Sequence, residues 1–284
     1  MKQRIKIFDN AFAHLQCSAH GNESKYIEWI RDEPVSPHET CWFTDLNLGR
    51  VDTVNCYRKI AWLVEPPCIL SNTYHYIMDN LKKFDYVLTH LKDLCKIAPD
   101  KVLWYPMGAV WTPKEECKIY PKTKDLSIIA SDKNYAPGHK IRHQIIKNFP
   151  DGSLHPNFKI DKYGRGYKAI DSKGEAFRDY RYSICVMNSQ VDDYFTDVIL
   201  DACAYGCIPI FWGTKNIGSY LNEMGILQFE DIGEFGDLSQ ILNQASDIQY
   251  ESMIPYIETN LQKIEEYRVA EDWMFRNYPF LFGV

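Results

Sequence analysis

The stretch Arg181-Tyr-Ser-Ile-Cys-Val-Met-Asn-Ser-Gln-Val-Asp-Asp-Tyr-Phe-Thr-Asp-Val-Ile-Leu-Asp-Ala-Cys-Ala-Tyr-Gly-Cys-Ile-Pro-Ile-Phe-Trp212 decides the fold class. Its apolar run at 181–186 predicts a buried strand, and 207–212 predicts a second one. Between them, 194–205 reads as a helix with one apolar stripe. Asp192 or Asp193 is available to cap its start, and Gly206 falls at its end. A strand, a helix and a strand in this order predict parallel strands joined by a right-handed crossover.

The same alternation extends over most of the chain. We expect further strands at 5–8, 59–64, 85–89, 102–105 and 126–130, and helices at 72–82, 91–97, 139–149 and 254–267. The polar stretch 111–124 holds two prolines and six charged residues, which is typical of an interdomain linker. The sequence therefore predicts an α/β protein with two Rossmann-like domains, whose parallel sheets face a cleft and bind ligands beyond the strands' carboxyl ends.

Composition narrows the class of protein. The 284 residues are 45% hydrophobic and 25% charged, which excludes wholesale disorder. A net charge of −6 argues against a general nucleic-acid binder. The nine cysteines form no C-x-x-C pair, and the eight histidines show no metal-ligand spacing, so we expect reduced thiols and no metal. With no signal peptide and no 18-residue apolar stretch, we expect a cytoplasmic protein without a transmembrane segment.

Two features of the second half suggest an anion site. Residues 188–197 supply Asn, Ser, Tyr, Thr and Asp at a helix N-terminus, a set that suits a ribose, a base edge and phosphate oxygens. An ordinary capping turn would explain only part of this set. Cations also gather between residues 139 and 168 of this acidic chain, among them Lys140, Arg142 and Arg165.

These residues resemble the fucosyltransferases of glycosyltransferase family 10. That family carries a signature of the form E-N-S-x-x-x-D-Y-[V/I]-T-E-K-L, followed by a small-residue helix and G-x-[V/I]-P-[V/I]-x-W-G. Here 187–199 and 206–213 keep that spacing. Upstream, 128–132, 140–142 and 161–166 are similar to the family's strand, Arg-bearing helix and glycine-containing connection. The segment Trp62-Leu-Val-Glu-Pro66 resembles a segment of the family's first domain.

The resemblance implies a GT-B fold that needs no metal, with an acceptor domain and a nucleotide-sugar domain. We place these domains at 1–118 and 119–266, and expect the aromatic segment 267–284 to pack back on the first. Glu65 occupies the position of the family's catalytic base, which removes the acceptor hydroxyl proton while the sugar inverts. The matching donor-nucleotide residues are Lys140, Arg142, Arg165, Asn188, Ser189, Tyr194, Thr196 and Asp197.

The resemblance favours GDP-fucose as donor and a glycan hydroxyl as acceptor. It also has departures on the donor side. Asp197 stands where the family has Glu, Val198 where it has a pyrophosphate-binding Lys, and Met187 where it has Glu. Removing one hydrogen-bonding group that stabilises the charge of the transition state typically slows a reaction by about 10²–10³-fold. Transfer of another nucleotide-activated sugar, and non-catalytic binding of a nucleotide or sugar, therefore remain alternatives.

Overall fold

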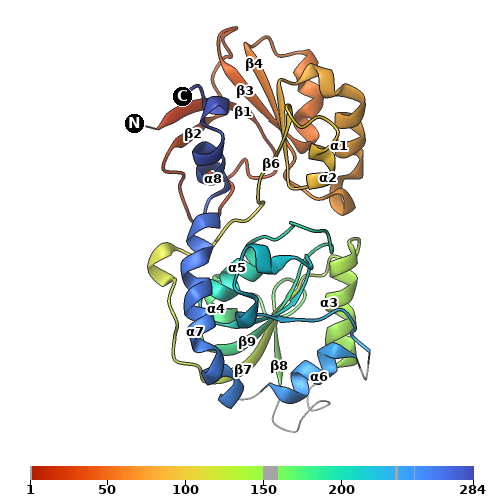
Figure 1. Ribbon diagram of the computed structural model, residues 1–284, viewed down its shortest axis with the longest axis vertical. Helices are drawn as coiled ribbons and strands as arrows, with labels where there is room; N and C mark the ends of the chain where they lie inside the picture. The colour runs from red at the N-terminus through yellow and green to blue at the C-terminus, as the bar shows by residue number, and fades with distance from the viewer. Residues whose placement is uncertain (1, 150–158, 234–235, 246) are drawn as a thin grey trace. The chain divides into compact units, whose positions relative to one another are not determined.

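A computed structural model describes residues 2–149, 159–233, 236–245 and 247–284. These residues form two compact units. Unit 1 comprises Met1–Ala109 together with Glu266–Val284, and unit 2 comprises Val110–Glu265. Each unit is built on one parallel β-sheet (Figure 1). The predicted α/β fold with two parallel sheets is confirmed.

Unit 1 contains a six-stranded sheet in the order β2-β1-β3-β4-β5-β6. Every neighbouring pair is parallel. The strands are β1 (Gln3–Phe8), β2 (Ile27–Ile30), β3 (Thr40–Thr44), β4 (Arg58–Trp62), β5 (Tyr86–Thr89) and β6 (Val102–Trp104). The helices are α1 (Pro67–Asn80), α2 (Lys92–Cys95) and α8 (Ala270–Asn277), with the 3₁₀ segments η1 (Asp45–Asp52) and η7 (Pro279–Phe282) among those that connect or follow them.

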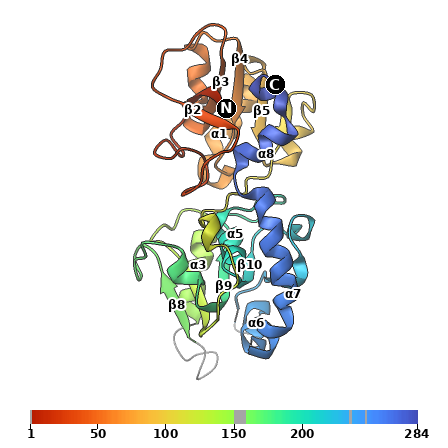
Figure 2. The ribbon, with the colours of Figure 1, turned by 90° about the vertical axis from the view of Figure 1, so that its left-hand side faces the viewer.

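Helical segments cover both faces of the unit 1 sheet. Alternate residues of β3 and β4, including Phe43 and Ala61, pack with Ile77 of α1 in one apolar cluster. The residues between them point to the other face, where the Trp42 ring stacks on Phe282 at 5.1 Å between centroids. Figures 1 and 2 show α8 on the face opposite α1 and α2. Unit 1 is therefore a three-layer α/β structure that is completed by the end of the chain.

Two acidic residues at the start of α8 tie that helix to the N-terminal region. Glu271 is fully buried and accepts hydrogen bonds from the backbone N–H and hydroxyl of Ser18 and from Trp29 Nε1. Asp272 accepts a 2.6 Å bond from the Ser24 hydroxyl. Because buried carboxylates are costly without such donors, these contacts specify where the aromatic tail binds within unit 1.

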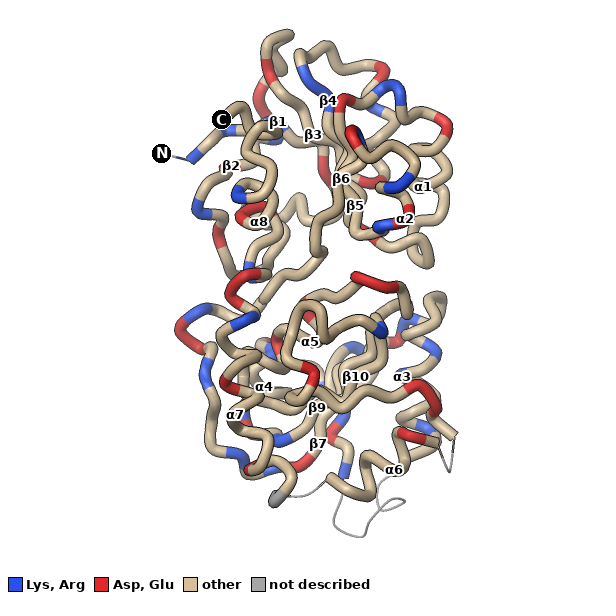
Figure 3. Tube along the Cα trace, in the orientation of Figure 1, with Lys and Arg blue, Asp and Glu red and all other residues tan. Residues whose placement is uncertain are grey.

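Unit 2 contains a five-stranded parallel sheet in the order β11-β10-β9-β7-β8. Its strands are β7 (Lys124–Ile129), β8 (Ile160–Tyr163), β9 (Tyr180–Val186), β10 (Ile208–Trp212) and β11 (Leu227–Gln228). Its helices are α3 (Pro137–Asn148), α4 (Gly174–Phe177), α5 (Asp197–Ala204), α6 (Asp237–Gln244) and α7 (Asp247–Lys263). Lys and Arg are interspersed with Asp and Glu along both units (Figure 3).

The central strands β7 and β9 carry isoleucines on one face of the unit 2 sheet and two serines at mid-strand on the other. Ile128 and Ile184 point to one face and pack with Ile145 of α3 and with residues of α6 and α7. Ser127 and Ser183 point to the other face, where their hydroxyls lie 3.1 Å apart. Since α4 and α5 contact β9 as well, the small side chains leave room for them and for the pocket described below.

Several sequence expectations need correction. The expected linker is part of unit 2: the backbone N–H groups of Trp111 and Thr112 bind Asp201, and Lys122 Nζ donates to Tyr205 O. The unit boundary therefore follows Ala109, ahead of the division expected after residue 118. The short strands β2, β3, β8 and β11 were not predicted, because two to five residues carry little periodicity.

The helix of the opening stretch also begins later than predicted. It starts at Asp197, and Thr196 caps it with a side chain that accepts from Val198 N, so neither Asp192 nor Asp193 is the cap. Asp193 instead adopts a left-handed conformation with φ 66°. Gly206 ends the helix as predicted, with φ 71°, which only glycine adopts without strain.

Candidate functional site

A cavity of about 240 Å³ opens in unit 2 beside the carboxyl ends of β7 and β8 and the start of α5. This is the edge at which open parallel sheets bind their ligands. Four charged side chains line the cavity: Arg142, Arg165, Lys173 and Asp197. Ser131, Gly164 and Val198 are also part of its wall. Lys173 pairs with carboxylates, but Arg142 and Arg165 remain beside a helix N-terminus and favour an anionic ligand.

The loop that leads into α5 is held by a buried acidic residue. The carboxylate of Asp193 accepts hydrogen bonds from Asn216 Nδ2, at 2.7 Å, and from the Tyr220 hydroxyl, while its backbone N–H donates to Thr214 Oγ1 at 2.9 Å. Asp tolerates the left-handed backbone better than most residues. These contacts stabilise the 188–196 loop against the segment that follows β10.

Arg142 joins α3 to the end of β9. Its Nε donates to Val186 O at 3.1 Å, and its Nη2 donates to the same oxygen and to Asn188 Oδ1 at 3.3 Å. Burial lowers the pKa of Arg142, and the neighbouring carboxylate of Asp197 partly offsets this. Gly138 permits the close approach, since a β-carbon there would lie 1.7 Å from Met187 O. Arg142 is therefore fixed in the cavity wall.

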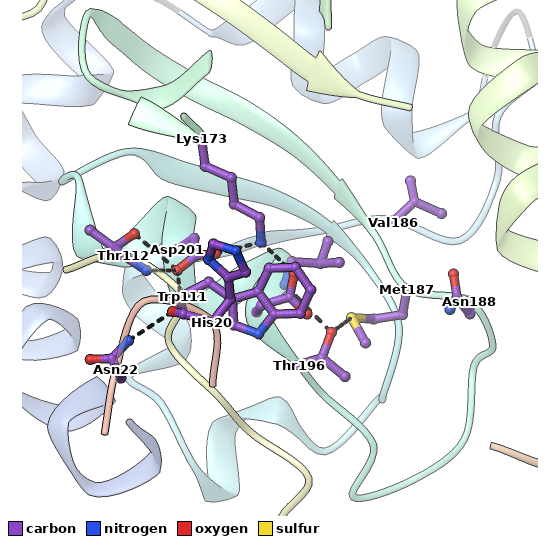
Figure 4. Close-up of polar contacts among 12 residues, drawn as sticks. His20, Asn22, Trp111, Thr112, Lys173, Val186, Met187, Asn188, Thr196 and Asp201 are labelled. Atoms are coloured by element: carbon purple, nitrogen blue, oxygen red, sulfur yellow. Dashed lines mark hydrogen bonds and ion pairs between the residues drawn. The ribbon is translucent and has the colours of Figure 1, made fainter. Parts of the chain in front are cut away.

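Lys173 is the cavity residue that sequence analysis missed. Its Nζ forms ion pairs with Asp197 and, at 2.6 Å, with Asp201 Oδ2. Asp201 is fully buried, and its Oδ1 accepts from Trp111 N, Thr112 N and the Thr112 hydroxyl at 2.8–2.9 Å. Figure 4 shows Lys173 reaching toward Asp201, whose carboxylate also meets Thr112.

Charges and burial act against each other in this cluster. Burial works to lower the pKa of Lys173, but Asp197 and Asp201 raise it above its usual value. Burial raises the pKa of Asp201, and the Lys173 ammonium opposes that shift. Lys173 lies outside the family signature and just before a four-residue helix, so no motif marked it.

The structure brings most of the expected donor residues together. Arg142, Arg165 and Asp197 line the cavity, Asn188 binds Arg142, and Thr196 caps α5. Ser189 and Tyr194 are buried residues of the 188–196 loop, and no residue of the described chain forms a hydrogen bond with the Ser189 hydroxyl. Lys140 is different: it is exposed on α3 and is not part of the cavity wall.

The expected base, Glu65, follows β4 in unit 1 and has its backbone held on both sides. Its N–H donates to Asp45 Oδ2 at 3.1 Å, and its carbonyl accepts from the Tyr74 hydroxyl at 2.8 Å. Val64 N donates to Asp45 Oδ1 at 2.9 Å. The Glu65 side chain is partly exposed. The strand end therefore holds this carboxylate on a rigid backbone, as a catalytic base requires.

Asp45 is a second carboxyl group at the same edge that was not predicted. It follows β3, is 3% exposed and has a left-handed backbone with φ 36°. Burial raises the pKa of Asp45 to about 7, against the two N–H donors that lower it, while Glu65 and Asp9 raise it further. Arg31 pairs with Asp9 at 3.2 Å at the ends of β2 and β1. Four strand ends thus carry charged residues, and the unpredicted β2 and β3 supply two of them.

Three properties bear on cofactors and location. All nine cysteines are free. Among the described residues, no three His, Cys, Asp or Glu side chains gather in a way that could hold a metal ion. Within the same residues, no helix combines the length and the apolar character that crossing a membrane requires.

Two parallel-sheet units, one with a cavity at the carboxyl edge of its sheet, define the GT-B class of glycosyltransferase folds. Residues 120–263 match the family described as "Glycosyltransferase family 10 (fucosyltransferase) C-term". The chain belongs to this family.

Curated relatives agree with this assignment. The alpha-(1,3)-fucosyltransferase FucT of Helicobacter pylori is 25% identical over an alignment of 135 residues, which covers 41% of this chain and 28% of that protein. A fucosyltransferase-like protein of Arabidopsis thaliana is 27% identical over 105 residues, 36% of this chain and 20% of that protein. The matches thus span less than a third of either relative.

Solved structures share the fold. An alpha1,3-fucosyltransferase aligns with a TM-score of 0.54 at 15% identity, covering 99% of this chain and 89% of that one. A trehalose-6-phosphate synthase aligns with a TM-score of 0.60 at 13% identity, covering 88% of this chain and 73% of that one. At these identities the likeness concerns the fold alone.

Proposed function

We propose that this chain is an inverting, metal-independent glycosyltransferase that transfers fucose from GDP-fucose to a hydroxyl group of a glycan. The observation that carries the proposal is the unit 2 cavity, where Arg142, Arg165 and Asp197 meet at the N-terminus of α5. Family membership supports the reaction class, and two related structures in the fold comparison contain GDP and GDP-fucose.

On the donor side, Arg142 and Arg165 bind the diphosphate and stabilise the charge that it gains as it leaves. Asp197 accepts hydrogen bonds from the ribose hydroxyls. Asn188, Ser189, Tyr194 and Thr196 surround the nucleoside, and the buried Ser189 hydroxyl gains a partner when it binds. A diphosphate role for Lys140 stays a prediction, because this side chain lies outside the cavity wall.

On the acceptor side, Glu65 acts as general base. It takes the proton of the acceptor hydroxyl as that oxygen bonds to the anomeric carbon of the sugar. The bond from this carbon to the diphosphate breaks on the opposite face, and its electron pair leaves with the GDP. The rigid backbone of Glu65 favours this role, because proton transfer requires a base within hydrogen-bond reach.

Thermal unfolding with GDP, UDP and CMP, each with and without EDTA, tests the donor assignment. We expect the largest rise in melting temperature with GDP and no effect of EDTA, because ligand binding to the folded state stabilises it. A matched pair of variants places the ligand: Arg142→Met should abolish the rise, whereas Lys147→Met, on an exposed position of the same helix, should not. A requirement for metal would refute the metal-independent mechanism.

Two alternatives remain, and both derive from the cavity wall. Val198 lines the cavity where the family's Lys would bring a cation, so another nucleotide sugar is the donor if UDP or CMP gives the larger shift. If GDP binds but GDP-fucose is not consumed with any glycan, a binding function without catalysis is favoured.

A further inference from the structure

Lys173 lines the unit 2 cavity, yet its ammonium group is already paired with two carboxylates. Its Nζ pairs with Asp201 Oδ2 at 2.6 Å and with Asp197, and it lies 4.3 Å from the centre of the Trp111 ring. An ammonium group has three N–H donors. Two carboxylates and the face of the Trp111 ring therefore surround the ammonium group.

The charge balance of Lys173, Asp197 and Asp201 also argues against a phosphate contact of Lys173. One ammonium faces two carboxylates, so the cluster does not offer the surplus positive charge that a phosphate needs. Within the described part of the chain, the two arginines of the wall, Arg142 and Arg165, have no such double pairing. Lys173 therefore does not replace, as a phosphate ligand, the cation that position 198 lacks.

The cluster is anchored to the backbone of unit 2. Asp201 takes three hydrogen bonds from Trp111 and Thr112 on one oxygen and binds Lys173 with the other. Lys173 in turn binds Asp197 Oδ2, while no described residue donates a hydrogen bond to Asp197 Oδ1. The chain of contacts runs from the backbone through Asp201 and Lys173 to one oxygen of Asp197, and leaves the other for the cavity.

We infer that Lys173 is a positioning residue for nucleoside binding: it holds the Asp197 carboxylate so that its second oxygen accepts hydrogen bonds from the ribose hydroxyls. This inference rests on the proposed function, since it requires a nucleotide in the unit 2 cavity. Lys173 touches Asp197, and Asp197 touches the ligand. Hydrogen bonds to a charged carboxylate are stronger than neutral ones, so the loss of their geometry lowers the affinity for the nucleotide measurably.

Calorimetry with GDP and 2′,3′-dideoxy-GDP tests this role, because the second ligand keeps the base and diphosphate but lacks both ribose hydroxyls. We expect the unaltered chain to bind GDP roughly 10- to 100-fold more tightly than the dideoxy ligand. In Lys173→Met, which keeps an unbranched stem over Trp111, that ratio should fall below about 3. Affinity for the dideoxy ligand should stay within about twofold.

Controls separate positioning from other roles. Lys173→Arg should restore most of the ratio, and Lys168→Met, which removes an exposed cation outside the cavity wall, should leave both affinities unchanged. If Lys173→Met does not fold, Lys173→Gln, which is polar but shorter and lacks the charge that pairs with both carboxylates, carries the same expectation for the ratio.

The other outcomes overturn the inference in distinguishable ways. An equal loss for GDP and dideoxy-GDP, with guanosine unaffected, would make Lys173 a phosphate ligand. An equal loss for all three ligands would make its role structural. If the unaltered chain binds neither nucleotide, the proposed function itself fails, and the inference fails with it.

Discussion

Replacing Asp45 by asparagine should flatten the pH dependence of unit 1 stability. Burial raises the pKa of Asp45 from 3.8 to about 7 in the folded chain. Between these two pKa values the folded state keeps the proton that the unfolded state releases. The contribution of this group to the free energy of unfolding is therefore fully present below the unfolded pKa. That contribution is lost as pH rises through the folded pKa.

The size of the effect follows from those two values. Between pH 5 and pH 8, the free energy of unfolding should fall by about 2–3 kcal/mol through this one carboxyl group. The amide of the Asp45→Asn variant cannot titrate, so this part of the slope disappears. That amide also has only one oxygen for the two N–H groups of Val64 and Glu65, which should cost about 1–3 kcal/mol at pH 5.

Urea unfolding followed by tryptophan fluorescence at pH 5, 6, 7 and 8 measures the difference. Unit 1 holds Trp29, Trp42, Trp62, Trp104 and Trp273, so this signal reports mainly on the unit that contains Asp45. Asp93→Asn is the matched control, because Asp93 is 91% exposed and pairs only at the surface with Lys96. Parallel pH profiles for the unaltered chain and Asp45→Asn would refute the reasoning, whatever their vertical offset.

Three further changes test the two sites and the tail. Glu65→Gln should lower transfer about 10²- to 10⁴-fold while GDP affinity stays unchanged; unreduced turnover in a fucose-transfer assay would remove Glu65 from its role. Val198→Lys should tighten GDP binding about tenfold or more by calorimetry, with Val198→Met as an uncharged control, and equal affinities would show that the cavity has no deficit of positive charge. Glu271→Ala should destabilise unit 1 by about 3–5 kcal/mol, since the donors of Ser18 and Trp29 lose their buried acceptor; Glu230→Ala, at an exposed site, should have little effect on the same urea curves.

The strongest sequence predictions concerned long elements with clear periodicity. The strand at 181–186, the strand at 207–212 and the helix before Gly206 all exist, because burial of a continuous apolar run leaves little choice of structure. Helix boundaries were predicted less accurately, as the start of α5 shows. Tyr194 was the expected first residue of this helix but precedes α5, since the contacts of Asp193 hold that loop in a turn.

Motif spacing predicted much of the donor set for a different reason. Residues of one loop and the helix that follows it stay close together in any fold, so Asn188, Thr196 and Asp197 lie near one another. Arg142 and Arg165 join them because both follow strands of the same parallel sheet. Lys140 shows the limit of this reasoning: two residues along a helix turn a side chain by about 200°, away from the face that Arg142 presents.

By itself, then, the sequence determined the α/β class, the family resemblance and the strand ends at which ligand-binding residues gather. Only the tertiary structure decided which partners those residues have. Asp45 and Glu65 are 20 positions apart, and Lys173 and Asp201 are 28 apart. Such pairs form because parallel strands bring distant segments to one edge of a sheet, and burial there makes each carboxylate depend on the donors it meets.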